Sequence, residues 1–181
     1  MKSIAQMTRA ELAAFVQKHL RAKGIDTILS GGACVTIYSQ EKYVSMDLDM
    51  IHTSLLAPKR KLIRAAMGAI GFIEDGRYFK HADTDIFVEF PDGPPSVGQE
   101  PVRSIVERKE STGVLRMLSP TECVKDRLAG YYHWDDRQCL VQAVLVAQAN
   151  QIDIEEVARW SKGEGKQALF KQIKHQLHIK T

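Results

Sequence analysis

The sequence contains few cysteines, no long apolar run and no familiar catalytic fingerprint. Its three cysteines, Cys34, Cys123 and Cys139, are odd in number and form no Cys-x-x-Cys pair that would suggest zinc or a redox centre, so we interpret them as reduced core thiols. No stretch approaches the ~20 apolar residues needed to cross a bilayer, and the first residues lack an apolar signal core. We therefore expect a cytoplasmic protein.

Three common motifs are also missing: Gly-x-Ser-x-Gly, the Walker phosphate loop and the dinucleotide fingerprint. The sequence thus gives no support to the chemistry that these motifs carry. With 181 residues, 44% hydrophobic and 26% charged, the composition is that of an ordinary folded protein. This length allows one sizeable core, or a core with a small helical appendage.

Charge is nearly balanced overall, at net +3, but it is uneven along the chain. Residues 161–181 contain one acid, Glu164, against five lysines: Lys162, Lys166, Lys171, Lys174 and Lys180. Such a tail could meet RNA phosphates, and the alternative is the solvated face of a terminal helix.

The first part of the chain reads as a mixed α/β unit. A capping box at Thr8-x-x-Glu11 opens an amphipathic helix that ends near Gly24, and a strand at 25–30 leads into Gly31-Gly32. A short helix or turn over 33–39 and a strand over 45–51 follow. Further on, the sequence predicts a helix from Pro58 to Gly71, with Leu62 facing inward, and strands over 77–80, 84–90, 102–107 and 114–118.

From Ser119 onward the pattern is helical. Ser119-Pro120-Thr121-Glu122 is a capping box with proline at the first helical position, and breaks are expected near Trp134-Asp135, at Asn150 and at 162–165. We therefore predict a mixed α/β unit with an N-terminal helix in residues 1–118. Residues 119–181 would form a helical C-terminal part packed on that core.

Asp47 and Asp49 are the most informative residues. They alternate with apolar residues on the strand 45–51, so both carboxylates face the same side and can reach one hard cation such as Mg²⁺. Gly31 and Gly32 end the preceding strand, where glycines let backbone N–H groups approach a phosphate closely. Each feature alone fits a solvent-facing strand or an ordinary turn, but their combination is much rarer.

A two-metal phosphoryl-transfer site needs a third carboxylate. Asp85 and Glu89 share one face of the strand 84–90. We prefer Glu89, because apolar residues flank it, and keep Asp85 as the alternative. Lys125 and Arg127 are the first cations of the helical part, and either could contact triphosphate oxygens; we choose Lys125 and expect it to face the same cleft.

Leu29-Ser30-Gly31-Gly32 and Ser45-Met46-Asp47-Leu48-Asp49 resemble the Gly-Gly/Ser and Asp-x-Asp signature of the polymerase-beta-like nucleotidyltransferase superfamily. Segments 87–98 and 118–128 look like bacterial members near the abortive-infection type IV toxins. The resemblance implies an α+β fold with a small mixed sheet and a helical C-terminal half, and transfer of a nucleoside monophosphate from an NTP to a hydroxyl or phosphate. It also implies metal binding by Asp47, Asp49 and Glu89, a triphosphate cradle at the two glycines, and a nucleotide contact at Lys125. Many members carry aspartate where this chain has Glu89.

Two hypotheses follow. The first is an active Mg²⁺-dependent nucleotidyltransferase using two ions, whose acceptor could be a tRNA end, a protein hydroxyl or a small molecule such as an aminoglycoside. The toxin resemblance would add an antitoxin protein as partner. The second is a catalytically inactive nucleotide-binding or scaffold protein with the same fold.

Overall fold

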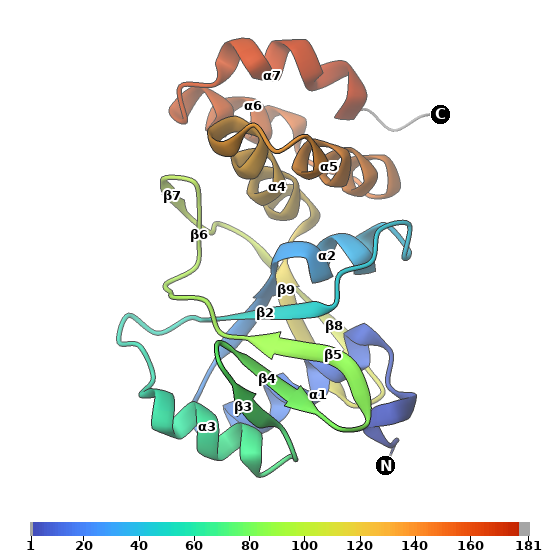
Figure 1. The fold of residues 1–181 in the computed structure, drawn as a ribbon. Coiled ribbons are helices and arrows are strands. Elements are labelled where there is room, and N and C mark those ends of the chain that lie inside the picture. Colours follow the sequence, from blue (N-terminus) through green and yellow to red (C-terminus); the bar gives the residue numbers. More distant parts are fainter. Residues whose placement is uncertain (1, 178–181) are drawn as a thin grey trace.

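The computed structural model describes residues 2–177, which form a mixed sheet with helices on both sides and a helical C-terminal half (Figure 1). The helices are α1 (Arg9–Arg21), α2 (Gly31–Tyr38), α3 (Arg60–Gly68), α4 (Pro120–Trp134), α5 (Arg137–Ala149), α6 (Ile154–Gly163) and α7 (Gln167–Ile173), with short 3₁₀ turns at Ile4–Gln6 and Lys174–Leu177. The main-sheet strands are β1 (Thr27–Ser30), β2 (Asp47–His52), β3 (Ile73–Asp75), β4 (Tyr78–His81), β5 (Thr84–Glu89), β8 (Ile105–Glu110) and β9 (Gly113–Leu118). A separate hairpin consists of β6 (Ser96–Val97) and β7 (Glu100–Pro101).

The main sheet has the strand order β3-β4-β5-β2-β1-β9-β8. Its centre combines both kinds of pairing, because β1 runs antiparallel to β2, while β2 is parallel to β5 and β1 is parallel to β9. Both edges are antiparallel hairpins. The predicted small mixed sheet is therefore confirmed.

One face of the central strands packs on α1. Leu48 and Met50 of β2 are fully buried, and the Gln17 amide of α1 contacts the Met50 sulfur at 3.7 Å. The alternation of β2 then turns Asp47 and Asp49 to the opposite face. Since α2 contacts β1 and β2 as well as α4 and α5, it lies between the sheet and the helical half.

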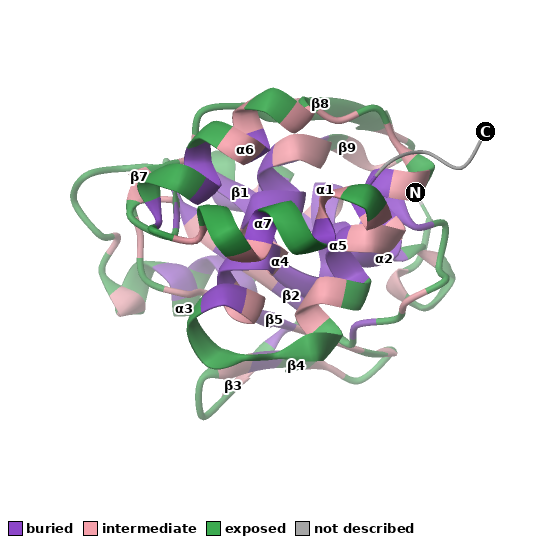
Figure 2. Ribbon diagram, turned by 90° about the horizontal axis from the view of Figure 1, so that it is seen from above, coloured by how far each residue is buried: buried purple, intermediate pink, exposed green. Residues whose placement is uncertain are grey.

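The helical half begins as the capping pattern predicts, with the Ser119 hydroxyl accepting the N–H of Glu122. Its helices end at Trp134, at Ala149 and at Gly163, which confirms the three expected breaks. Buried residues run through the middle of the molecule, and exposed ones lie on the outer loops and on the outer side of α7 (Figure 2). Within residues 2–177, no helix combines the length and apolar character that crossing a bilayer requires.

Local expectations failed where short-range patterns are weak. The helix expected from Pro58 begins at Arg60, because Lys59 keeps an extended backbone as the N-cap. Leu62 is 53% exposed instead of buried, since Ile63, Ala66 and Met67 form the inward face. The edge strand β3 and the two-residue strands β6 and β7 were not predicted, because they have too few residues to show an alternating pattern.

Candidate active site

Three carboxylates converge on the face of the sheet opposite α1. Asp49 lies directly across from Glu89 in the parallel pairing of β2 with β5, and Asp47 precedes Asp49 by two residues on the same side. Each of the three residues offers an oxygen, and these atoms all lie within 4.8 Å of one another. The preferred third carboxylate, Glu89, thus joins the pair, whereas the alternative, Asp85, is exposed on β5 and outside the cluster.

Gly31 closes one side of this cluster. Its neighbour Ser30 pairs with Asp49 across β1 and β2, and Gly31 itself has φ of +66°. A Cβ atom at Gly31 would lie 1.9 Å from Asp49 Oδ2, so no other residue fits without displacing that carboxylate. Gly31 and Gly32 also form the first turn of α2, where backbone N–H groups lack intrahelical partners and favour an anion.

Ser45 links Asp47 to the glycines. Its hydroxyl donates to Asp47 Oδ1. A Cβ atom added at Gly32 would lie only 2.8 Å from the same hydroxyl oxygen. The Ser45 N–H donates to the Thr36 hydroxyl, which in turn donates to the Gly32 carbonyl. Sequence reasoning did not select Ser45, although the alternation that pointed to Asp47 and Asp49 includes it.

The electrostatics of the cluster are unfavourable without a cation. Burial, followed by the charges of Asp47 and Glu89, raises the pKa of Asp49 from 3.8 to about 7, against an opposing contribution from Arg127. The guanidinium of Arg77 lies 3.5 Å from Glu89 and offsets part of the charge from the solvent side. Converging hard oxygen donors whose negative charge is poorly compensated fit a divalent cation such as Mg²⁺.

The structure does not bring Lys125 to this cluster. Lys125 is fully buried, and its ammonium binds Glu122 at 2.9 Å and Glu156 at 3.1 Å. Arg127, two residues further along α4, projects from a different side of the helix because consecutive helical residues are rotated by about 100°. Its guanidinium binds Asp126 and the Gln142 amide oxygen, and it is the cation whose charge acts on Asp49.

Asp136 and the basic tail do not belong to the carboxylate cluster. Asp136 caps α5 by accepting the N–H groups of Gln138 and Cys139. In the basic tail, Lys162 and Lys171 are exposed, while the single acid Glu164 is buried against His133 at 2.8 Å. Lys180 lies outside the described residues.

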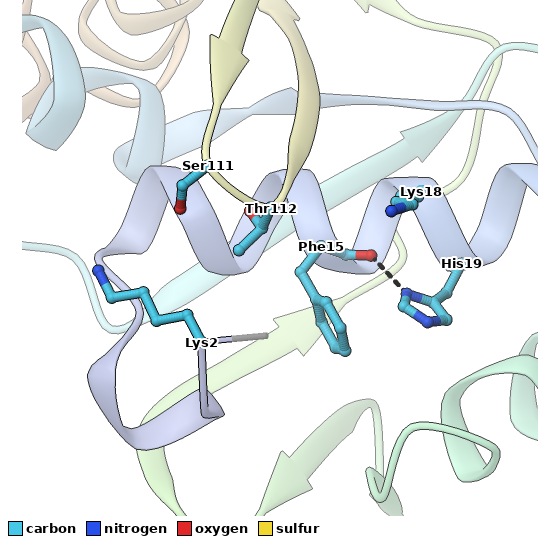
Figure 3. Close-up of a pocket in the computed structure, with 6 residues that line it drawn as sticks. All are labelled: Lys2, Phe15, Lys18, His19, Ser111 and Thr112. Atoms are coloured by element: carbon cyan, nitrogen blue, oxygen red, sulfur yellow. Dashed lines mark hydrogen bonds between the residues drawn. The ribbon is translucent and has the colours of Figure 1, made fainter.

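A cavity of about 410 Å³ lies away from the carboxylates, between α1 and the turn joining β8 to β9 (Figure 3). It is lined by Lys2, Phe15, Lys18, His19, Ser111 and Thr112. Its two hydroxyl groups already donate to the carboxylate and carbonyl of Glu11. Because this cavity contains none of the converging carboxylates, its size alone does not make it the active site.

The fold is that of nucleotidyltransferases. A nucleotidyltransferase-like antigenic protein of Paracoccidioides brasiliensis aligns over 96% of this chain and 94% of its own, with a TM-score of 0.58 and 13% identity. The antibiotic-resistance factor ANT(2″)-Ia aligns over 90% of this chain and 94% of its own, with a TM-score of 0.51 and 11% identity. The same factor in complex with adenylyl-2″-tobramycin covers 87% and 94%, with a TM-score of 0.50 and 12% identity.

These similarities are structural. No protein-family model matches the sequence, and no curated protein matches it significantly. At such low identity, the solved structures establish the fold and leave the reaction to be argued from the site.

Proposed function

We propose that this chain is a Mg²⁺-dependent nucleotidyltransferase that transfers a nucleoside monophosphate from an NTP to a hydroxyl or phosphate acceptor. The observation that carries the proposal is the convergence of Asp47, Asp49 and Glu89 beside Gly31, at a position where the backbone leaves no room for a side chain. Neither half of this arrangement is specific alone. Together they would put a cation site next to backbone N–H groups that a phosphate can reach.

Asp47, Asp49 and Glu89 would hold the divalent ions, most simply two of them, which supply charge neutralisation on the triphosphate. The N–H groups at the start of α2 would donate hydrogen bonds to phosphate oxygens, and the lack of a side chain at Gly31 lets the phosphate come close to them. In the reaction, the acceptor oxygen forms a bond to the α-phosphorus while the bond to the pyrophosphate oxygen breaks; pyrophosphate leaves with the electron pair, and a hydroxyl acceptor gives up its proton to the departing pyrophosphate or to water.

Arg127 is a better candidate than Lys125 for the fixed cation of this site. Both acids that bind Lys125 would have to release it before it could meet a phosphate, and breaking a buried ion pair is costly. Arg127 is partly exposed, with a side chain 19% accessible, and its charge already acts on Asp49. Its fork of N–H donors also suits phosphate oxygens.

Of the three expected acceptors, a tRNA end, a protein hydroxyl and a small molecule, two are supported by further observations, and the assay can separate them. ANT(2″)-Ia is described with an adenylylated aminoglycoside, so a polyhydroxylated small molecule is one class. RNA is the other, and it fits the toxin resemblance and the exposed lysines of the C-terminal helices. An antitoxin partner would accompany the second class only.

The test is pyrophosphate release from mixed NTPs with Mg²⁺, measured separately with bulk RNA and with an aminoglycoside panel. Wild type should release pyrophosphate with one acceptor class, and Asp47→Asn and Glu89→Gln should each lose about 100-fold or more. Asp85→Asn is the matched control, because it removes an exposed carboxylate from the same strand as Glu89.

Three outcomes would count against the proposal. NTP binding without turnover by wild type would favour the inactive nucleotide-binding protein. Equal losses of activity in Asp85→Asn and Glu89→Gln would refute the assignment of Glu89 as the third carboxylate. Full activity of Asp47→Asn would remove the metal site itself.

A further inference from the structure

Arg9 is a largely buried cation that forms no ion pair with any residue between 2 and 177. It is the first residue of α1 and is 9% exposed. Its Nε atom is buried and makes no hydrogen bond, and within residues 2–177 no carboxylate oxygen lies within 4.0 Å of its guanidinium. A buried charge in this state is unfavourable, so folded proteins seldom keep one unless something pairs with it.

Arg9 lines a cavity of about 160 Å³, roughly the space of five water molecules. A second arginine, Arg108 of β8, lines the same cavity, together with Thr8 and Thr36. The only acid in its lining is Glu41, which is exposed and acts on Arg9 through its charge without forming an ion pair. Arg108 is paired with Glu110 at 3.3 Å, so Arg9 is the arginine of this cavity that has no ion pair within residues 2–177.

The start of α1 adds backbone donors to this cavity. The capping box uses the N–H groups of Thr8 and Glu11, and the N–H groups of Arg9 and Ala10 have no partner within the helix. Both carboxylate oxygens of Glu11 are engaged by Lys2, Ser111 and the Thr8 N–H, so this acid does not neutralise Arg9. A 13-residue helix also presents the positive end of its dipole here.

We propose that this cavity is an anion site that binds a phosphate group between Arg9, Arg108 and the N-terminus of α1. The Arg9 guanidinium supplies the charge, the helix start supplies oriented N–H donors, and the cavity has room for a phosphate. The phosphate could be free, or it could belong to an RNA chain. This site is separate from the carboxylate cluster and does not depend on the proposed reaction.

The cavity is nevertheless connected to the candidate active site. Thr36, which lines it, donates to the Gly32 carbonyl and accepts the N–H of Ser45, and the Ser45 hydroxyl holds Asp47. Asp47 in turn acts electrostatically on Arg9. An anion bound at Arg9 would therefore lie on one side of Thr36, while Ser45 and Asp47 lie on the other.

The experiment is thermal unfolding in EDTA, with sodium phosphate compared against sodium chloride at equal ionic strength. For a Kd of about 1 mM, 20 mM phosphate should raise the Tm of wild type by about 3–7 °C. Arg9→Met should lose this response while keeping most of the side-chain volume. Since phosphate also stabilises proteins through exclusion from their surface, the response left in Arg9→Met measures that general effect.

Arg108→Gln is a second variant that tests the same site if Arg9→Met does not fold. Arg108 has a 44% accessible side chain and pairs with Glu110 at the surface, so its loss should lower the Tm in chloride only slightly and still reduce the phosphate response at least twofold. A short single-stranded RNA, with phosphodiesters only, distinguishes the two sources. An Arg9-dependent shift with RNA at micromolar concentration identifies the nucleic acid, and a shift with millimolar phosphate alone identifies the free ion.

Two results would overturn the proposal. Equal phosphate and RNA responses in wild type, Arg9→Met and Arg108→Gln would show that the cavity holds no anion. A lower Tm of Glu41→Gln, together with no specific phosphate response of wild type, would show that Glu41 is the counterion of Arg9 in solution. Asp47→Asn should keep the phosphate response, so failure of this site and failure of the nucleotidyltransferase proposal are separable.

Discussion

Replacing Asp49 with asparagine should stabilise the metal-free protein at pH 8. Burial and the charges of Asp47 and Glu89 raise the pKa of Asp49 from 3.8 to about 7. At about 1.4 kcal/mol per pKa unit, this corresponds to an upper limit of about 4 kcal/mol. Asparagine is buried at a cost of its own, so we expect a gain of about 1–3 kcal/mol in the free energy of unfolding.

The effect should depend on pH with a defined sign. Below pH 3.8 the carboxyl is protonated in both states and costs nothing. Between pH 3.8 and about 7 the unfolded chain releases its proton while the folded one keeps it, so the stability of wild type falls as pH rises. Asp49→Asn lacks this contribution, and its advantage over wild type should therefore grow across this window and level off above it.

Urea unfolding in EDTA at pH 4.5 and pH 8 measures the difference. With a slope of about 2 kcal/mol per molar urea, the midpoint of Asp49→Asn should exceed that of wild type by about 0.5–1.5 M at pH 8 and by much less at pH 4.5. Mg²⁺ should raise the midpoint of wild type and have little effect on the variant. Asp85→Asn, on the exposed part of β5, should behave like wild type. A destabilised Asp49→Asn at pH 8 would refute the idea that the carboxylates repel one another.

Three further substitutions test the surroundings of the cluster. Gly31→Ala should abolish NTP binding, because the added Cβ atom would lie 1.9 Å from Asp49. Gly24→Ala is the matched control: Gly24 has a similar backbone, with φ of +74°, but an added Cβ atom would have no neighbour within 4 Å. This control should cost only about 1 kcal/mol of stability. Lys125→Met should destabilise the fold by about 3–5 kcal/mol in urea, since Glu122 is left buried without a counterion while Glu156 keeps Arg159, and the folded fraction should bind NTP normally by calorimetry. Arg127→Gln should weaken NTP binding about tenfold or more with a smaller loss of stability, and unchanged affinity would remove Arg127 from the site.

The sequence by itself determined the elements whose signals are local. The capping box at Thr8 and the one at Ser119 both start helices where predicted, because capping is a contact between residues three apart. The common face of Asp47 and Asp49 follows from the alternation of a strand and needs no tertiary information. These regularities were enough to anticipate an α/β part followed by a helical half, whereas the small mixed sheet was expected from the family resemblance.

Strand order was beyond local reasoning, and it decided which carboxylate of β5 lies beside Asp47 and Asp49. Glu89 and Asp85 share a face of β5, and only the register that sets Glu89 across from Asp49 selects between them. The closeness of Gly31 to Asp49 likewise depends on β1 pairing with β2. Pairings between distant segments are set by how the apolar faces pack together, which one strand's pattern does not encode.

The cations show the same division most clearly. Lys125 and Arg127 are equivalent in the sequence, both basic and two residues apart on a predicted helix. The tertiary structure buries Lys125 between two acids, one of them on α6, and leaves Arg127 to act on Asp49. Arg9 has no sequence signal at all, because a lack of partners is a property of the packed chain. The sequence determines which charges exist, and packing decides which of them are paired, because pairing depends on residues that meet only in the folded chain.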